Sequence, residues 1–215
     1  MAPLTVEIWS DVVCPWCYVG KRRFESALAD FEHRDEVQTI WRSFQLDPNA
    51  PPERRVSSAE HLAGKYGMSV EQAERSNAQM TELAASEGLE YHLDRTRGGN
   101  SFDAHRLIQL AADHDLQDAM KERLMRAYFT EGEPVGDLDT LARLAGEVGV
   151  DAEPVLAGDG YADAVLADVE LAARIGIRGV PYFVLDRRFG VSGAQPVELL
   201  LQALEKAWEA QTQAA

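Results

Sequence analysis

Hydrophobic residues run continuously or alternate with polar ones in short stretches near both ends of the chain, which is typical of β-strands. Near the start, the apolar run Leu4–Trp9 predicts a buried strand, and the β-branched and aromatic stretch Val37–Phe44 predicts a second. Near the end, two more strands are expected at Tyr182–Leu185 and Phe189–Ser192. The residues between the first two strands, Cys14–Asp30, have the amphipathic spacing of a helix.

The middle of the chain has a helical pattern of hydrophobic residues instead. Helices are predicted at Ala59–Tyr66, Val70–Glu87, Phe102–Asp113, Leu116–Thr130 and Leu138–Val148. Two further helices, Ala162–Ile175 and Pro196–Ala210, flank the last two strands. The order is therefore β-α-β, a block of helices, and then α-β-β-α. We expect an α/β protein in which an all-α helical insertion, residues 57–157, interrupts a discontinuous domain made of residues 1–56 and 158–215.

The net charge of the chain argues against two classes of binding partner, nucleic acids and anionic membranes. Its 215 residues include 36 acidic and 21 basic ones, which gives a formal net charge of -15. Proteins that bind nucleic acid or anionic membranes present basic surfaces, so we expect neither partner. No apolar run approaches the roughly 20 residues of a membrane span. The first residues carry neither the basic nor the apolar part of a secretory signal, and we therefore expect a cytoplasmic protein.

The only two cysteines, Cys14 and Cys17, form a Cys-Pro-Trp-Cys sequence between the first predicted strand and the helix that follows. A C-x-x-C pair in this place is typical of a thiol–disulfide active site. The positive end of a helix dipole lowers the pKa of a nearby thiol. We therefore expect Cys14 to be the exposed, low-pKa attacking thiolate and Cys17 to be the resolving thiol. A structural zinc needs four ligands, and no metal site is predicted because there are no further cysteines.

Four segments, taken in order, resemble one family. They are Ser10-Asp11-x-x-Cys14-Pro15-Trp16-Cys17-Tyr18-x-Gly20, Asn100-Ser101-Phe102-Asp103-Ala104-His105-Arg106, Gly176-Ile177-Arg178-Gly179-Val180-Pro181-Tyr182-Phe183-Val184 and Val191-Ser192-Gly193-Ala194-Gln195. Together they resemble the DsbA-like oxidoreductases, most closely their cytoplasmic FrnE-like branch. The resemblance implies a thioredoxin fold split by the helical insertion. It also implies a cis peptide at Val180-Pro181, facing the cysteines and able to pair with an extended peptide or glutathione.

The candidate site combines residues from the motifs with residues that the resemblance adds. We expect Cys14, Cys17 and Pro181 to be catalytic, Trp16, Val180, Phe102 and His105 to bind substrate, and Glu7 or Asp11 to relay a proton. The insertion is expected to form a helical lid with Phe102 and His105 on the helix that faces the site. The intervening Trp16 offers a flat apolar surface and can tune the redox potential of the pair.

The sequence therefore predicts a thiol–disulfide oxidoreductase acting on a disulfide or dithiol of a protein or small molecule. No cofactor is expected, glutathione is a candidate redox partner, and a homodimer is compatible with the sequence. One alternative is a glutathione-dependent isomerase or transferase acting on a small aromatic or polyketide-like molecule. Those relatives usually carry serine where Cys14 stands and Ser-Asp where this chain has Ala194-Gln195. A second alternative is a non-catalytic binding or holdase module.

Overall fold

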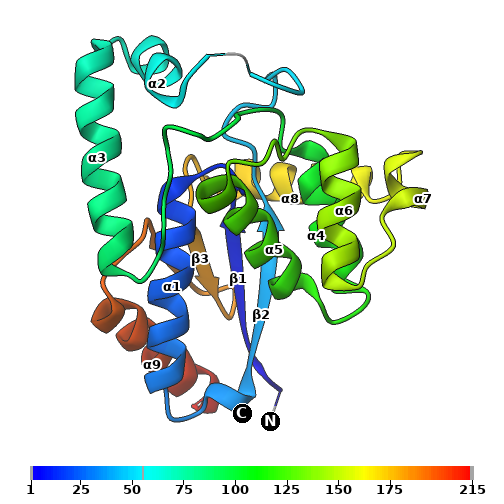
Figure 1. Ribbon diagram of the computed structural model, residues 1–215. Coiled ribbons are helices and arrows are strands. Elements are labelled where there is room, and N and C mark those ends of the chain that lie inside the picture. Colours follow the sequence, from blue (N-terminus) through cyan, green and yellow to red (C-terminus); the bar gives the residue numbers. More distant parts are fainter. Residues whose placement is uncertain (1, 55, 214–215) are drawn as a thin grey trace. The chain divides into compact units, whose positions relative to one another are not determined.

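The computed structural model describes residues 2–54 and 56–213 (Figure 1). It divides into two compact units. The first, here called the sheet unit, comprises Met1–Leu46 and Leu166–Ala215, and the second, the helical unit, comprises Asp47–Val165. The predicted insertion, residues 57–157, lies within the helical unit, and its own boundaries stay a prediction.

The sheet unit is built on four strands in the order β2-β1-β3-β4. The first strand, β1 (Leu4–Ser10), runs parallel to β2 (Val37–Ser43). On its other edge β1 pairs antiparallel with β3 (Tyr182–Leu185), which pairs antiparallel with β4 (Phe189–Ser192). All four strands predicted from the sequence are confirmed, and Figure 1 shows them as one mixed sheet.

One face of the sheet packs against α1 (Pro15–Asp30). Phe24 of this helix lies 5.6 Å, between ring centroids, from Phe183 of β3. Ile8 of β1 is fully buried and pairs with Phe183, so the two side chains lie on the same face of the sheet. Because side chains alternate along a strand, every second residue of β1 points to this face. The last helix, α9 (Val197–Thr212), contacts α1 and completes this layer.

The opposite face of the sheet is covered by the end of α8 (Ala162–Arg174). Trp9 packs there against Ala172 and Ile177, and all three side chains are buried. The indole Nε1 of Trp9 donates a hydrogen bond to the backbone oxygen of Asp168 at 3.0 Å. The indole therefore has both an apolar environment and a polar partner, as a buried tryptophan requires.

The helical unit contains α2 (Ser58–Tyr66), α3 (Val70–Ser86), α4 (Phe102–Ala112), α5 (Gln117–Arg126), α6 (Leu138–Val148) and α7 (Glu153–Leu156). The sequence Ser69-x-x-Gln72 has the spacing of a capping box, which the structure confirms at the start of α3, and Ser57 with Glu60 forms a second one at the start of α2. Where one helix was predicted over Leu116–Thr130, α5 instead ends at Arg126 and is followed by a π-helical turn, Ala127–Glu131. Two short elements were not predicted: α7, and a single turn of 3₁₀ helix, η1 (Arg34–Glu36).

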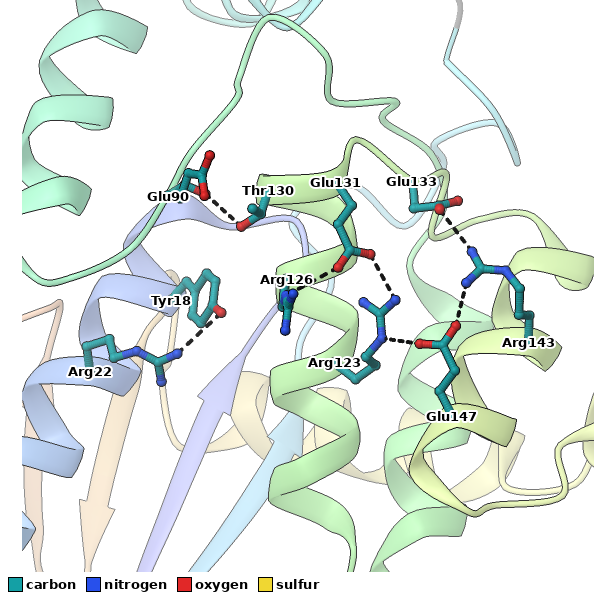
Figure 2. Close-up of polar contacts among 10 residues, drawn as sticks. All are labelled: Tyr18, Arg22, Glu90, Arg123, Arg126, Thr130, Glu131, Glu133, Arg143 and Glu147. Carbon is teal, nitrogen blue, oxygen red and sulfur yellow. Dashed lines mark hydrogen bonds and ion pairs between the residues drawn. The ribbon is translucent and has the colours of Figure 1, made fainter.

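A chain of ion pairs joins α5, the π-helical turn and α6 (Figure 2). Arg123 contacts Glu131 at 2.8 Å and Glu147 at 2.7 Å. Arg143 then contacts the same Glu147 at 2.6 Å and Glu133 at 2.9 Å. These charges are partly exposed, so each pair contributes little on its own, but the shared partners fix the geometry of the turn.

Both ends of the helical unit are held by residues that flank the start of α4. Asn100 donates through its side-chain amide to the backbone oxygens of Pro48 and Ala50, each at 3.1 Å. Arg106 donates to the backbone oxygens of Val155, Gly158 and Gly160, the last at 2.8 Å. The Asn100–Arg106 segment therefore ties the segment that enters the helical unit to the segment that leaves it.

We predict that Arg106→Met lowers the free energy of unfolding by about 2–4 kcal/mol, because three carbonyl oxygens lose their charged donor. Urea denaturation measures the change. Arg126→Met is the matched control, since the Arg126 side chain is 64% exposed and its ion pair with Glu131 is a surface contact. The control should change stability by less than about 1 kcal/mol. Equal effects of the two substitutions would contradict the anchoring role.

Candidate active site

The two cysteines lie where the turn after β1 passes into α1. Cys14 is the N-cap residue of α1, with extended backbone, and Pro15 occupies the first turn, where its missing N–H is not needed. The turn is closed by the N–H of Cys14, which donates to the backbone oxygen of Asp11 at 3.2 Å. Cys17 follows within the first turn and donates its N–H to the backbone oxygen of Cys14 at 3.0 Å.

The two cysteines are free thiols that are buried and hydrogen-bonded to one another. Cys14 is 4% exposed and Cys17 is 1% exposed. A side-chain hydrogen bond with Cys17 raises the pKa of the Cys14 thiol well above its ordinary value, and burial and the negative charge of Asp11 act in the same direction. The N–H of Cys17 partly offsets these effects.

The prediction of an exposed, low-pKa Cys14 is therefore wrong. Cys14 does stand at the helix N-terminus, but its hydrogen bond with Cys17 and its burial raise its pKa by more than the backbone N–H of Cys17 lowers it.

The segment before β3 lies beside Cys14. The Val180-Pro181 peptide bond is cis, and the Cys14 thiol donates to the backbone oxygen of Val180 across 3.7 Å. The register of the sheet explains this placement, because Trp9 near the end of β1 pairs with Tyr182 at the start of β3. The turn that carries Cys14 and the segment that carries Pro181 therefore leave the same end of the sheet.

Trp16 stands between the cysteines and is 46% exposed. Its neighbours on α1, Cys17 and Tyr18, are buried. The indole thus presents an open apolar surface next to the thiol pair. Its expected contact with substrate stays a prediction.

Asp11 is fully buried and close enough to Cys14 for its charge to act on the thiol. Its carboxylate accepts a hydrogen bond from the backbone N–H of Leu46 at 2.8 Å. A buried carboxylate this close to a thiol can exchange a proton with it. Of the two carboxylates predicted as a relay, Asp11 is the one whose charge acts on the Cys14 thiol.

Glu7 is buried in a different setting, an ion cluster on the sheet. Its carboxylate accepts from Arg42, with Nε at 3.0 Å, and from Arg187 Nε at 3.2 Å. Arg42 also contacts Asp168 at 3.0 Å, and Asp168 accepts from the N–H of Ser43 at 2.9 Å. These partners give Glu7 a role in joining β1, β2 and α8, which the sequence did not predict. A charged residue in each of two neighbouring buried strands, Glu7 and Arg42, was the available signal.

Phe102 and His105 belong to α4 of the helical unit. Phe102 is half-buried and His105 is 1% exposed. Both lie within the segment that holds the ends of this unit, between Asn100 and Arg106. Their role in substrate binding, and the lid that it implies, stay predictions.

Two classes of feature are absent from the described residues. No group of three or more histidine, cysteine, aspartate or glutamate side chains within residues 2–54 and 56–213 could hold a metal ion. Over the same residues, no helix has both the length and the apolar character needed to span a membrane.

We predict that Asp11→Asn lowers the pKa of Cys14, because the carboxylate's negative charge raises it and the amide oxygen still accepts from Leu46. A lowered pKa means more thiolate at a given pH, so alkylation of the reduced protein becomes faster below that pKa. Mass spectrometry of Cys14 labelling across pH measures it.

The matched control for this substitution is Asp30→Asn, which makes the same charge change at the exposed far end of α1, about 24 Å away along the helix. An unchanged labelling profile in Asp11→Asn, or an equal change in both variants, contradicts the charge argument.

Comparison with known proteins places the chain in a family. The DSBA-like thioredoxin domain matches residues 5–205. The crystal structure of a probable DsbA oxidoreductase from Streptomyces coelicolor is 47% identical, with a TM-score of 0.91, and the match covers 96% of this chain and 90% of that one. DsbA-like proteins need no cofactor.

Two other matches are more distant. The uncharacterized protein YwbO of Bacillus subtilis is 29% identical over 157 residues, which is 68% of this chain and 66%, just under two thirds, of that protein. The cytosolic disulfide reductase DsbM from Pseudomonas aeruginosa, solved with GSH, is 18% identical with a TM-score of 0.64, and the match covers 98% of this chain and 99% of that one. At this identity the likeness shows the fold alone.

These comparisons confirm the predicted fold, a thioredoxin fold with a helical insertion, and the predicted resemblance. The thiol pair at the start of α1 agrees with both. This chain belongs to the family of DSBA-like thioredoxin domains.

Proposed function

We propose that this protein is a thiol–disulfide oxidoreductase in which Cys14 is the attacking thiolate and Cys17 the resolving thiol. One observation carries the proposal: the two sulfurs share a hydrogen bond at the start of α1, beside the backbone oxygen of Val180. A pair of sulfurs so close can form a disulfide without moving the backbone far.

The reaction needs only these two sulfurs and the substrate. The Cys14 thiolate attacks one sulfur of a substrate disulfide, a mixed disulfide forms, and the other substrate sulfur leaves as a thiolate and takes up a proton. Cys17 then attacks the sulfur of Cys14, which forms the Cys14–Cys17 disulfide and releases the second substrate thiol. Two electrons pass from the enzyme dithiol to the substrate, and the reverse sequence oxidises a dithiol.

The shared hydrogen bond explains how a buried Cys14 can react. The pair loses its first proton as a unit, and the remaining proton can lie on either sulfur. When it lies on Cys17, Cys14 carries the charge. Cys14 is the less buried sulfur and the one beside Val180, so it is the one that a substrate reaches. Asp11 is the proposed acceptor for the proton that the pair gives up.

The same environment favours reduction of substrates over their oxidation. A strongly stabilised thiolate favours the reduced pair and makes its disulfide a strong oxidant. The hydrogen bond with Cys17 raises the pKa of Cys14 while Cys17 holds the charge, and burial and the negative charge of Asp11 also disfavour a thiolate at Cys14. A low-molecular-mass thiol such as glutathione is the proposed reductant that restores the dithiol. A FrnE-like identity and a cytoplasmic location, where such thiols are abundant, fit this direction.

Substrate would dock on the backbone next to Cys14. The oxygen of Val180 and the start of β3 provide main-chain groups that an extended peptide can pair with. Trp16 adds an exposed apolar surface on the α1 side. A peptide disulfide laid against Val180 would bring one of its sulfurs to Cys14.

We predict that Cys14→Ser lowers the rate of insulin reduction by about 1000-fold or more, because the attacking atom is lost. Cys17→Ser should instead accumulate a mixed disulfide at Cys14, because attack still occurs and resolution does not. Turnover and intact-protein mass spectrometry measure the two effects.

The same two variants separate the alternatives. A glutathione-dependent isomerase or transferase would keep turnover of a small electrophile after loss of Cys17. A holdase would keep its function when both cysteines are serine. Either result would contradict the proposal that this protein catalyses disulfide exchange.

We predict that Phe102→Ala or His105→Ala slows reduction of a bulky protein disulfide by about 10-fold if these residues contact substrate, with little change for a small disulfide. His114→Ala, at the exposed end of the same helical region, is the control. Because His105 is buried, the thermal unfolding of each variant is measured in parallel. If the reduction rate falls equally with both substrates, Phe102 and His105 have only a structural role.

A further inference from the structure

Gly20 is buried in α1, one turn after Cys17. A side-chain carbon added at this position would lie 2.8 Å from Cγ of Pro181. Non-bonded carbons prefer a separation of about 3.5–4.0 Å, so this carbon would overlap the proline ring. The residue lies inside a regular helix, so space and not backbone conformation requires glycine here.

The neighbouring atoms leave the added carbon no free direction. Cβ of Pro181 would be 3.4 Å away and Cβ of Ala194 3.5 Å away. Cγ of Pro181 belongs to a ring that is closed on its own backbone nitrogen, and Pro181 is buried. The ring therefore cannot rotate aside as a flexible side chain would. Beyond the change that ring pucker allows at Cγ, relief of the overlap requires the Val180-Pro181 peptide and α1 to move apart.

The side of α1 that carries Gly20 also carries the thiol pair. Cys17, Gly20 and Arg23 follow at intervals of three residues and so form one ridge of the helix. Arg23 donates to the backbone oxygen of Ala194 at 2.7 Å. The two facing segments are joined to each other, because the N–H of Gly193 donates to the oxygen of Pro181 at 2.8 Å. Gly20 thus lies where α1 comes close to both of these segments.

The position of Pro181 controls the position of the atom beside the reactive sulfur. The oxygen of Val180, which is 3.7 Å from Cys14 Sγ, belongs to the peptide that ends at the nitrogen of Pro181. Any shift of the proline ring is passed directly to that oxygen. The distance between Cys14 and the backbone on which a substrate would dock is therefore set at Gly20.

We propose that Gly20 is a positioning residue, whose missing side chain lets the Val180-Pro181 backbone lie close enough to Cys14 to hold a peptide disulfide for attack. The proposal rests on the disulfide-exchange function proposed above. Restoring contact distance in Gly20→Ala requires a shift of about 1 Å. A misplacement of that size can cost about 100-fold in rate.

The test compares Gly20→Ala with Gly64→Ala, a helical glycine of α2 around which an added carbon meets nothing within 4 Å. Each variant is assayed with insulin, whose chains can pair with the Val180 backbone, and with bis(2-hydroxyethyl) disulfide, which has no peptide groups. The equilibrium of the Cys14–Cys17 pair with a glutathione buffer is measured as a further readout.

For Gly20→Ala we expect kcat/KM for insulin to fall about 10–100-fold, while the small disulfide and the glutathione equilibrium change less than about threefold. Gly64→Ala should leave all three unchanged. The proposal is overturned if Gly20→Ala lowers kcat/KM by the same factor for both substrates. It is also overturned if the variant turns over insulin as fast as the wild type. A wild type that reduces neither substrate would overturn the proposed function itself, which is a distinguishable result.

A double substitution keeps the test decisive if Gly20→Ala does not fold. Pro181→Ala removes the ring carbon that the new side chain would strike. In the Pro181→Ala background, Gly20→Ala should fold and change the insulin rate by less than about threefold. If Pro181→Ala alone folds and the double variant does not, or if the effect of Gly20→Ala is undiminished in that background, Pro181 is not what limits space at Gly20 and the proposal is overturned.

Discussion

The candidate site depends on the antiparallel pairing of β1 with β3. The cysteines follow β1 and the cis-proline segment precedes β3, so they are more than 160 residues apart in sequence. Because the two strands run in opposite directions with Trp9 opposite Tyr182, the end of one meets the start of the other. The Cys14 sulfur and the Val180 oxygen are neighbours for that reason alone. The fold therefore supplies both the thiol pair and the backbone beside it.

Three buried residues, Trp9, Asp168 and Glu7, stabilise this arrangement on the opposite face of the sheet. The Trp9 indole is anchored to the backbone of Asp168, and the Asp168 carboxylate in turn accepts from Arg42 and Ser43. Glu7 completes the cluster as a second carboxylate on Arg42. Breaking a buried ion pair leaves an uncompensated charge, which is costly, so the cluster ties α8 to β1 and β2 in one register. The Glu7 carboxylate is occupied by these ion pairs, whereas the negative charge of Asp11 acts on the Cys14 thiol.

The hydrogen bond between the two thiols changes the pKa that a cysteine at a helix N-terminus would otherwise have. A lone, exposed cysteine at the N-cap position would gain from the helix dipole. Here the second sulfur competes as a hydrogen-bond partner, and burial penalises charge on either one. The pKa of Cys14 is therefore raised, and not lowered as the helix N-terminus alone would predict. The close contact between Gly20 and Pro181 lies beside the thiol pair, on the same helix.

Local patterns in the sequence determined the strands, most helices, the capping box at Ser69 and the thiol pair at the start of α1. These features follow from hydrophobic periodicity and from residues only a few positions apart, so the amino-acid sequence is enough to predict them. Three features came from tertiary structure alone: the ion partners of Glu7, the carbonyl oxygens that Arg106 binds, and the raised pKa of Cys14. Each depends on groups distant in sequence or on burial by the whole fold. Charge, exposure and coupling are properties of an environment, and only the folded chain creates that environment.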